Sequence, residues 1–495
     1  MNRKFACSIL AAPLVLSGCI SLAPDPQVPV VAAEMPESYA FASDNGDYVP
    51  AAWWTTYEDP TLNALVETAL VQNFDIAEAA ARVEQARAQA RIARSALLPT
   101  LNVNGGATSS STPLAGSAFG GLGGGGIDRI ENDTVSLSLG AAYEVDFFGR
   151  ARNDLLAARA DAIATEYDFR TIRLATAAEV IAAYFDIVDT RRQLTLAQET
   201  ADVLQDRADR TNERFERGLV QSFELYQVQQ QLRATQASVP QLEAALAANE
   251  GRMAILLGTY RGEVSELLEG DLTPQLVFED VPTGLSTQLL QQRPDVAAAW
   301  ARLEASRLRI GARRAERFPR LSLSASIGSQ GDGIGSALNI LDNWAASLAA
   351  NIVAPIIDGG RISANIRAAR AAYDQNAAAY ARSVVTAFTE VENALAEYDQ
   401  QRRRYVLITA QLREAEASLD LQRRRYAAGV GSYITYLDAL RTVRQVEASL
   451  SGSARATALA RLGVHRALGG DWAPVIETPS LEMQPAETAA AGDAS

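Results

Sequence analysis

An internal duplication limits the fold of this chain more than any other feature of its sequence. Because the spacing between matching motifs shortens by nine residues, the first copy carries an insertion between Pro99 and Gly149. A stretch with nine glycines in 22 residues, Gly105 to Gly126, lies there and indicates a loop. The matching motifs are Asp75-Ile76-Ala77 with Asp295-Val296-Ala297, 220 residues apart, and Phe148-Gly149-Arg150 with Gly359-Gly360-Arg361, 211 residues apart.

Both copies predict the same order of elements: a helix, two strands, a very long helix and a return helix. Asp59 as cap and Pro60 at the first helical position begin the first helix, and Pro99 stops it after Leu98. The expected ranges are 60–268 for repeat one (strands about 100–146, long helix 151–216, return helix 222–257), 269–283 for a linker, and 284–472 for repeat two (strands about 320–354, long helix 361–428, return helix 432–468). A flexible tail is expected over 473–495.

The strand pairs alternate between apolar and polar residues, as in Leu137, Leu139 and Ala141 of the first copy and Leu321, Leu323 and Ala325 of the second. A period of two gives each strand one apolar and one polar face. Strands of about ten residues with this pattern are typical of transmembrane β-barrels. The alternative is a soluble protein with two hairpins packed on helices.

The long helices carry no proline or glycine over 151–216 or over 361–427. Their apolar residues recur every three or four positions, which predicts coiled-coil packing. At about 1.5 Å per residue each would reach about 100 Å. Gly218 and Gly429 are expected to end them, and the return helices to begin near Ser222 and Ser432.

Four strands cannot close a barrel, and open sheet edges are not tolerated in lipid. The chain is therefore expected to oligomerise. Two copies would give eight strands with a lumen filled by side chains, whereas three would give twelve strands and room for a pore. Helices attached to each strand pair would continue such a barrel as a tube.

The N-terminus predicts a secretory signal over residues 1–18. Arg3 and Lys4 precede a short apolar stretch, which ends in Leu16-Ser17-Gly18-Cys19 and is similar to the lipobox of bacterial lipoproteins. Cleavage before Cys19 and its acylation would leave a lipid-anchored extension over 19–59 and no free thiol, because Cys7 leaves with the signal. The alternative is an ordinary signal followed by an incidental cysteine. No later apolar run of 18 residues predicts a transmembrane helix.

Composition excludes several classes of function. The formal charge of −14 opposes nucleic-acid binding. Lys4 is the only lysine, so catalytic lysine chemistry is absent, and two cysteines with the single His465 cannot form a zinc site. We expect no enzyme activity, no catalytic residues, no metal and no cofactor apart from the lipid on Cys19. His465 is expected to be structural.

These features occur together with short motifs in a fixed order. The chain resembles the TolC-like outer membrane factor family, in particular its lipoprotein branch, over essentially the whole mature sequence. The resemblance implies an α+β membrane protein: a homotrimer with a twelve-stranded transmembrane β-barrel, four strands per chain, continued by an α-helical coiled-coil tunnel in the periplasm. The motifs are Trp53-Trp54, Asp59-Pro60, Tyr143 to Asp146 with Gly149-Arg150, Gln292 to Val296, Arg425-Tyr426 with Gly429, Leu437-Asp438, and Ala467 to Gly470 with Trp472.

The same resemblance implies a gate at the periplasmic tip. Asp438 corresponds to an aspartate that lines the closed tip in the family, and Ile434 to an apolar residue that narrows it further. Three copies of Asp438 would form an acidic ring; the alternative is a solvated aspartate near a helix start. Glu224 falls where some members carry a second tip carboxylate. Tyr426 belongs to the same region, and Arg441 is a candidate for ion pairs that latch the coils.

The function implied is a passive exit duct for drugs or other toxic small molecules in a tripartite efflux pump. Its partners would be a periplasmic membrane-fusion adaptor, an inner-membrane proton-driven transporter of the RND type and outer membrane lipid. Metal-ion efflux and type I protein secretion use the same kind of duct and stay open as alternatives. A periplasmic coiled-coil adaptor lipoprotein would carry only one helical hairpin, against which the duplication argues.

Overall fold

The computed structural model describes residues 22–25, 52–113, 129–270, 272, 281, 293–339 and 342–469. Cys19, the predicted tail and most of the predicted linker lie outside these residues. None of the helices within the described ranges is both long and apolar enough to cross a bilayer.

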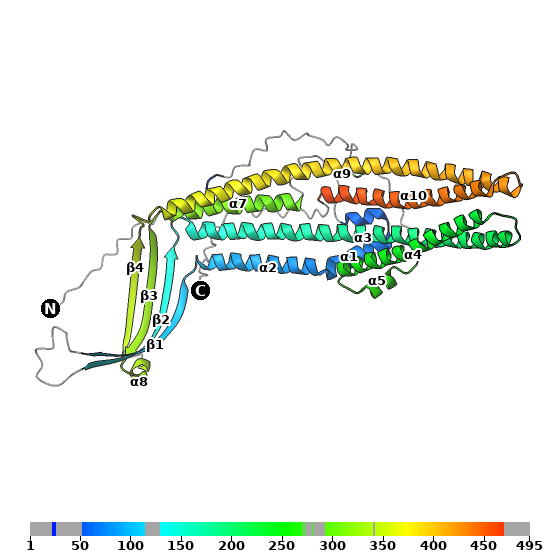
Figure 1. Ribbon diagram of the computed structural model, residues 1–495. Coiled ribbons are helices and arrows are strands. Elements are labelled where there is room, and N and C mark those ends of the chain that lie inside the picture. Colours follow the sequence, from blue (N-terminus) through cyan, green and yellow to red (C-terminus); the bar gives the residue numbers. More distant parts are fainter. Residues whose placement is uncertain are drawn as a thin grey trace, which may run out of the picture. The chain divides into compact units, whose positions relative to one another are not determined.

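The order of elements repeats, as the duplication predicts (Figure 1). A 3₁₀ helix, η1 (Trp53–Tyr57), precedes the first copy, and α8 (Ile334–Leu338) is a short addition to the second. The first copy contains α1 (Pro60–Gln72), α2 (Phe74–Ser95), β1 (Thr100–Pro113), β2 (Arg129–Val145), α3 (Arg150–Glu216), α4 (Ser222–Leu257) and α5 (Arg261–Leu267). The second contains α7 (Pro294–Ala315), β3 (Arg320–Gly331), β4 (Trp344–Val353), α9 (Arg361–Ala427) and α10 (Tyr433–Ala467).

The long and return helices agree with their predicted ranges to within one residue at each end. The first helix was predicted wrongly as one piece over 60–98. Asn73 takes an extended conformation between α1 and α2, and its side-chain oxygen accepts hydrogen bonds from the backbone nitrogens of Asp75 (2.9 Å) and Ile76 (3.1 Å). This cap starts a second helix in place of continuing the first. α2 then ends at Ser95.

The glycine-rich loop is also shorter than predicted. β1 continues to Pro113 and β2 begins at Arg129, so part of Gly105 to Gly126 is strand, and residues 114–128 lie outside the described part. In this part of the hairpin both faces are polar, so alternation gives no signal. Backbone hydrogen bonds nevertheless continue the ladder, with Ser109 opposite Asp133.

The described residues form two compact units. Unit 1 comprises Met1–Val28, Ala86–Ala162 and Arg302–Asn376; unit 2 comprises Pro29–Gln85, Ile163–Ala301 and Ala377–Ser495. Each unit takes segments from both repeats, and α3 and α9 contribute to both. The units that pack are therefore different from the units that were duplicated.

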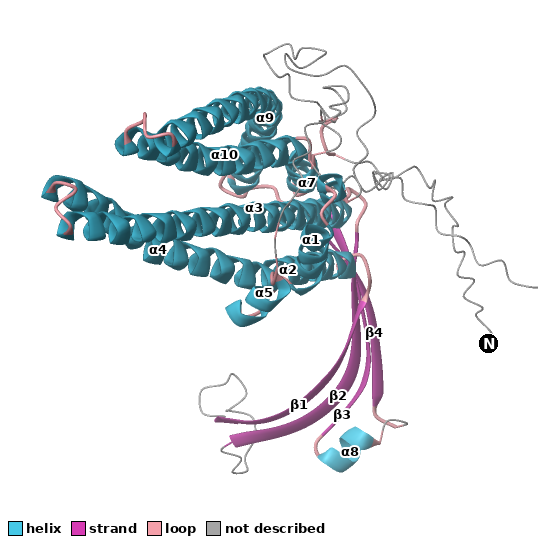
Figure 2. Ribbon diagram, turned by 90° about the vertical axis from the view of Figure 1, so that its right-hand side faces the viewer, coloured by secondary structure: helices cyan, strands magenta, loops and turns pink. Residues whose placement is uncertain are grey.

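Unit 1 contains a curved antiparallel sheet in the order β1-β2-β3-β4 (Figure 2). The register aligns apolar residues in rows across it: Leu101 pairs with Ala141, Ala141 with Ala325, and Ala325 with Leu348. This face is open, since Leu348 is 84% and Ile352 72% exposed. The opposite face is lined by serine and asparagine, with Ser326 and Ser347 joined by a hydroxyl hydrogen bond of 2.8 Å. The predicted alternation is confirmed.

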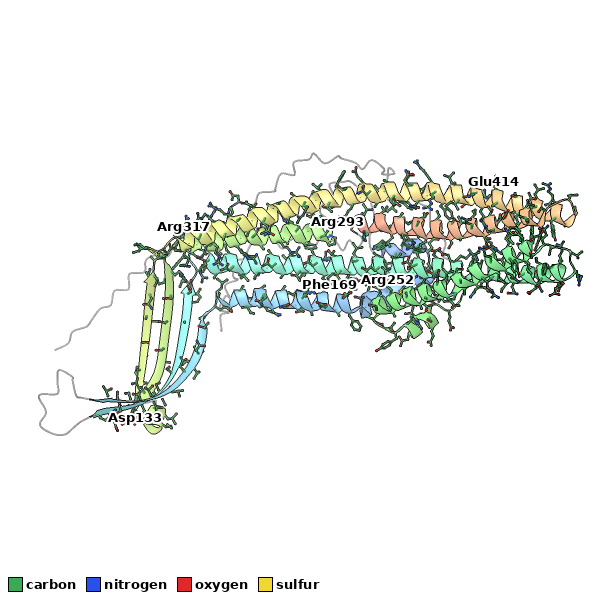
Figure 3. The ribbon with its side chains drawn as sticks, in the orientation of Figure 1. Asp133, Phe169, Arg252, Arg293, Arg317 and Glu414 are labelled. Carbon is green, nitrogen blue, oxygen red and sulfur yellow. The ribbon has the colours of Figure 1, made fainter. Side chains whose placement is uncertain are left out.

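Unit 2 holds the main hydrophobic core. It is formed by η1, α1, α5, part of α3 and the ends of α4 and α10 that lie away from the turns, with Trp53, Leu62, Ile181 and Leu257 almost fully buried. Polar contacts extend this packing along the helices: Arg252 of α4, labelled in Figure 3, pairs with Asp186 of α3 at 3.5 Å. Ser451 of α10 donates to Asp189 of α3 at 2.6 Å.

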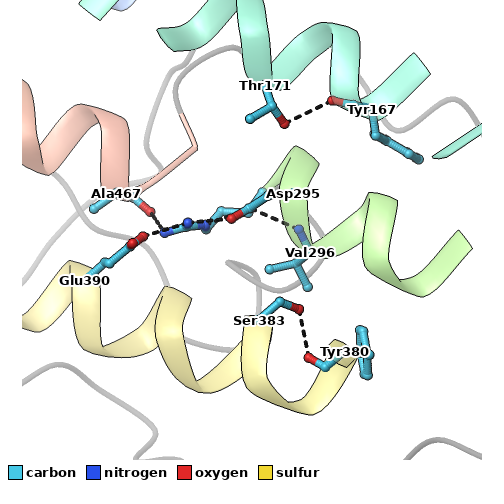
Figure 4. Close-up of polar contacts among 9 residues, drawn as sticks. Tyr167, Thr171, Asp295, Val296, Tyr380, Ser383, Glu390 and Ala467 are labelled. Carbon is cyan, nitrogen blue, oxygen red and sulfur yellow. Dashed lines mark hydrogen bonds and ion pairs between the residues drawn. The ribbon is translucent and has the colours of Figure 1, made fainter. Parts of the chain in front are cut away.

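The duplication reappears in two matching tethers in unit 2. The Asn73 side chain donates to the carbonyl of Leu256 at 2.9 Å, and Arg293 donates to the carbonyl of Ala467 at 3.0 Å. Asn73 and Arg293 are 220 residues apart, and the two carbonyls 211, the spacings of the repeat. Figure 4 shows how Asp295, Glu390 and the Ala467 carbonyl converge on the guanidinium; Arg293 contacts each carboxylate at 2.7 Å. Each repeat thus fixes the end of its return helix to the start of another helix.

Candidate functional site

Two helical turns in unit 2 end in the same backbone motif. Gly218 and Gly429 both adopt positive φ, at 69° and 74°. The nitrogen after each glycine bonds back over five residues, from Leu219 to Arg214 at 2.8 Å and from Val430 to Arg425 at 3.0 Å. This is a Schellman motif, which favours glycine because other side chains strain at positive φ. The predicted ends of α3 and α9 are confirmed.

The return helices then begin with different caps. The Ser432 hydroxyl accepts a hydrogen bond from the Ile434 nitrogen at 3.2 Å, whereas Gln221 precedes α4 without a side-chain cap. Ser222 is itself the first residue of α4. The first turn of α10 therefore has a fixed geometry, and this turn carries the aromatic residues of the site.

Three tyrosines stack beside the second turn. Tyr426 at the end of α9 lies 4.8 Å from Tyr433 and 6.0 Å from Tyr436, measured between ring centroids. The guanidinium of Arg207, on α3, lies over the Tyr433 ring at 4.5 Å from its centroid. This cation–π contact joins the α3–α4 hairpin to the α9–α10 hairpin.

Two cavities adjoin Arg207 and bring the predicted gate residues together. A cavity of about 100 Å³ has Ile434, Asp438 and Arg441 among its lining residues, and a second of about 300 Å³ has Glu224, Tyr426 and Ile434. Arg207, Gln227, Val228 and Ile434 line both. All five residues predicted for the gate thus lie in one region around Arg207.

Arg207 carries the positive charge of this region. Burial lowers its pKa, while the charges of Tyr433, Asp438, Glu224 and Tyr426 act in the opposite direction. Its Nε atom is buried and has no hydrogen-bond partner within the described residues. The two predicted tip carboxylates therefore lie in the field of one partly desolvated cation.

Sequence reasoning missed Arg207. It lies eleven residues before Gly218 in a helix with many arginines, so its type alone carries no signal. Comparison of the repeats contains one: Arg207 corresponds to Ser418, 211 residues later, and Tyr433 to Ser222. The first repeat therefore supplies the cation, and the second supplies the aromatic ring.

Arg441 makes no ion pair within the described part of the chain, whereas Arg444, one turn further on, contacts Glu199 of α3 at 3.2 Å and Glu447 at 2.8 Å. The latch by Arg441 stays a prediction for the assembled protein. His465 lies far along α10 in the core, stacked on Trp53 at 5.1 Å between ring centroids. Among the described residues no group of His, Cys, Asp and Glu could hold a metal ion.

A duplicated chain with four amphipathic strands and two long helical hairpins defines a class, the TolC-like outer membrane channels, in which a β-barrel is continued by a helical tunnel. The family model of the outer membrane efflux proteins matches residues 65–259 and 285–470. The chain belongs to this family, whose members are outer membrane efflux channels.

Individual relatives match over nearly their whole length. The probable outer membrane lipoprotein SilC of Salmonella typhimurium is 29% identical over 465 residues, covering 92% of this chain and 97% of that protein. The antibiotic efflux pump outer membrane protein ArpC of Pseudomonas putida is 30% identical over 483 residues, covering 95% and 96%. The crystal structure of the CmeC outer membrane channel of Campylobacter jejuni matches in fold with a TM-score of 0.85 at 23% identity, over 92% of this chain and 95% of that one.

Proposed function

We propose that this chain is the outer membrane duct of a tripartite efflux system and works as a homotrimer. The sheet carries the argument. Its order leaves one side of β1 and one side of β4 without a partner, and its apolar face is open. Lipid does not tolerate such edges, so further strands must pair with them. Three chains give twelve strands, enough to enclose a pore.

The substrates we propose are drugs or other toxic small molecules, and the duct is passive. The name of ArpC, an antibiotic efflux pump protein, supports this class. The periplasmic adaptor and an inner-membrane RND-type transporter are the partners that such a duct requires, because it contributes no energy of its own. Metal-ion efflux and type I secretion would use the same architecture.

The gate we propose lies where the two helical turns meet. Ile434, Asp438, Glu224, Tyr426 and Arg441 line neighbouring cavities with Arg207 between the hairpins. In a trimer this arrangement would occur three times around one axis. The chain is also proposed to carry lipid on Cys19, which supports an outer membrane location with helices extending into the periplasm.

The test combines assembly and conduction. Chemical cross-linking of the purified protein is expected to stop at three chains, and the same preparation is expected to conduct ions in planar bilayers. A monomer that conducts would contradict the argument from the open sheet edges. A trimer that binds no adaptor would retain the channel but refute its place in a pump.

A further inference from the structure

Residues 22–25 lie against α7 in unit 1. Arg307 donates from Nη1 to the carbonyl oxygen of Pro24, and Arg314 donates from Nη1 to the carbonyl oxygen of Leu22 at 3.1 Å. Both bonds go to backbone atoms, so they hold the path of the chain regardless of its side chains.

One of these arginines is positioned by α7 itself. Arg307 contacts both carboxylate oxygens of Glu304, with Nε at 2.7 Å from Oε2. The two side chains are only 14% and 18% exposed. This bidentate pair fixes the guanidinium and leaves Nη1 free to bond Pro24.

Gly311 provides the space between the two arginines. A Cβ atom at this position would lie 2.7 Å from the nitrogen and 2.9 Å from the Cα of Ala23, closer than real Cβ atoms come. The absent side chain therefore lets the backbone of Ala23 lie directly on the helix. Ala23 also packs against a buried cluster formed by Ala157, Ala160, Ala305 and Leu308.

The segment has a defined direction on the helix. Its earlier residue, Leu22, bonds to Arg314, and its later residue, Pro24, bonds to Arg307, so it runs antiparallel to α7. Its N-terminal side therefore points toward the end of α7 at Ala315, from which the chain continues into β3 at Arg320. Cys19 comes three residues before Leu22, and its Cα is limited by covalent geometry to about 11 Å from that of Leu22.

The site shortens the tether between the lipid and the fold. Without it, the next described segment begins at Ala52, 33 residues after Cys19. A flexible chain of that length spans about 30 Å on average and can extend much further. With Leu22 bound to Arg314, only three residues separate the anchor from the fold, which raises the effective concentration of the sheet at the membrane surface.

We propose that Arg307, Gly311 and Arg314 form a binding site, called here the α7 seat, for the first residues of the mature chain. The seat holds the acylated Cys19 next to the start of β3, and so speeds insertion of the strands into the bilayer. This inference rests on the proposed lipid anchor and outer membrane location.

Thiol labelling tests whether the seat is occupied. Ala23→Cys introduces the only free thiol of the mature acylated protein, and we expect slow maleimide labelling in the folded state. Gly311→Leu, or Arg307→Ala with Arg314→Ala, is expected to accelerate labelling about tenfold or more, because the segment then leaves the helix. Gly251→Leu is the matched control, since a Cβ at this helical glycine meets nothing within 4 Å.

Fast labelling in the parent, or a rate that Gly311→Leu does not change, would overturn the seat. Conductance in planar bilayers, measured for every variant, separates this result from failure of the channel. If the parent itself forms no conducting oligomer, the proposed function fails, whatever the labelling rate.

Spacer insertions test the role in membrane insertion. A flexible spacer of about ten residues placed after Ser21 lengthens the tether between lipid and seat, whereas the same spacer after Asp25 leaves it unchanged. In pulse-labelled cells we expect the first insertion and Gly311→Leu to slow formation of the membrane-inserted oligomer several-fold, and the second to have no effect. Equal rates with a normally conducting final product would refute the anchoring role alone.

Discussion

Among single residues, Asp59 shows how a buried charge is made compatible with a core. One carboxylate oxygen accepts from the backbone nitrogens of Thr61 at 2.9 Å and Leu62 at 3.1 Å and so caps α1. The other accepts from the Tyr184 hydroxyl at 2.5 Å. Burial, with the hydrogen bond to Asp59, raises the pKa of Tyr184 far above its usual range. Both oxygens are therefore satisfied, one by local and one by distant donors.

The Asp59–Tyr184 pair predicts unequal costs for its two truncations. Tyr184→Phe removes one hydrogen bond to a charged group, a loss of about 1.5–3 kcal/mol. Asp59→Ala loses the helix cap and also leaves the buried hydroxyl without its partner, so the free energy of unfolding is expected to fall by about 2–4 kcal/mol. Denaturant unfolding followed by circular dichroism measures both. In the double variant the losses should be less than additive, and strict additivity would contradict a direct interaction.

His465 is the only histidine and is 3% exposed. It is surrounded by the rings of Trp53 and Tyr57, with the cation of Arg461 over the Tyr57 ring. Burial, reinforced by the charge of Arg461, lowers the pKa of His465 to about 3. The imidazole is thus neutral in the folded protein at physiological pH.

This lowered pKa predicts an acid-sensitive contribution to stability. The unfolded chain binds a proton at His465 below about pH 6.5, whereas the folded chain does not until about pH 3. The contribution is therefore complete above about pH 6.5 and is lost as the pH falls toward 3. His465→Phe keeps the stacking on Trp53 and removes the titration. Its melting temperature should fall less between about pH 7.5 and about pH 4.5 than that of the parent.

Gly463→Ala is the control for the same helix, since a Cβ there meets nothing within 4 Å. This variant should show the pH dependence of the parent. An equal fall in the parent and in His465→Phe would mean that other groups account for the acid sensitivity.

Among elements, the two hairpins are held together near their turns by few contacts. Arg207 reaches from α3 to Tyr433, and Arg444 reaches from α10 to Glu199. Further from the turns the contacts become more numerous, for example between Arg455 and Asp186. Separation of the hairpins therefore requires the loss of only a few charged contacts near the turns, which suits a gate.

Arg207 predicts the strength of that latch. Arg207→Met keeps an apolar stem in the cavity but removes the cation–π contact and the charge facing Asp438 and Glu224. The resting conductance of single channels should rise, because the α3–α4 hairpin then separates from α10 more easily. Arg210→Met is the matched control, since its exposed side chain pairs only with Asp206 of the same helix at 2.9 Å. Unchanged conductance in Arg207→Met would place the latch elsewhere.

For the whole molecule, three chains create sites that one chain lacks. Asp438 is exposed in the single chain and lines a cavity with Ile434. Around the axis of a trimer three such carboxylates would approach one another, and their repulsion would be relieved by a multivalent cation.

The acidic ring predicts block of the channel by multivalent cations from the periplasmic side. Asp438→Ala should weaken this block, and Asp438→Arg should shift ion selectivity toward anions. Recordings in planar bilayers, with Glu224→Ala as comparison for the second carboxylate, measure both. Block and selectivity that are unchanged in the Asp438 variants would exclude Asp438 from the constriction.

Several features followed from the sequence because they depend on neighbours within one or two turns. The alternation around Leu321 to Ala325 specifies a two-faced strand, and Gly218 and Gly429 specify helix ends where positive φ is needed. The spacing of the repeats predicted the element order and which residues surround the turns. The break at Asn73 was missed because an asparagine in a helical pattern becomes a cap only if its side chain turns toward the following backbone.

The tertiary structure alone decided which distant side chains meet. Each residue turns a helix by about 100°, so the partner of a side chain depends on how two long helices are rotated and shifted against each other. Arg207 above Tyr433, Glu390 on Arg293, and Arg314 on Leu22 all join segments far apart in the chain. Local periodicity contains no information on these registers. Packing of the two units fixed them, and with them the residues of the latch and the seat.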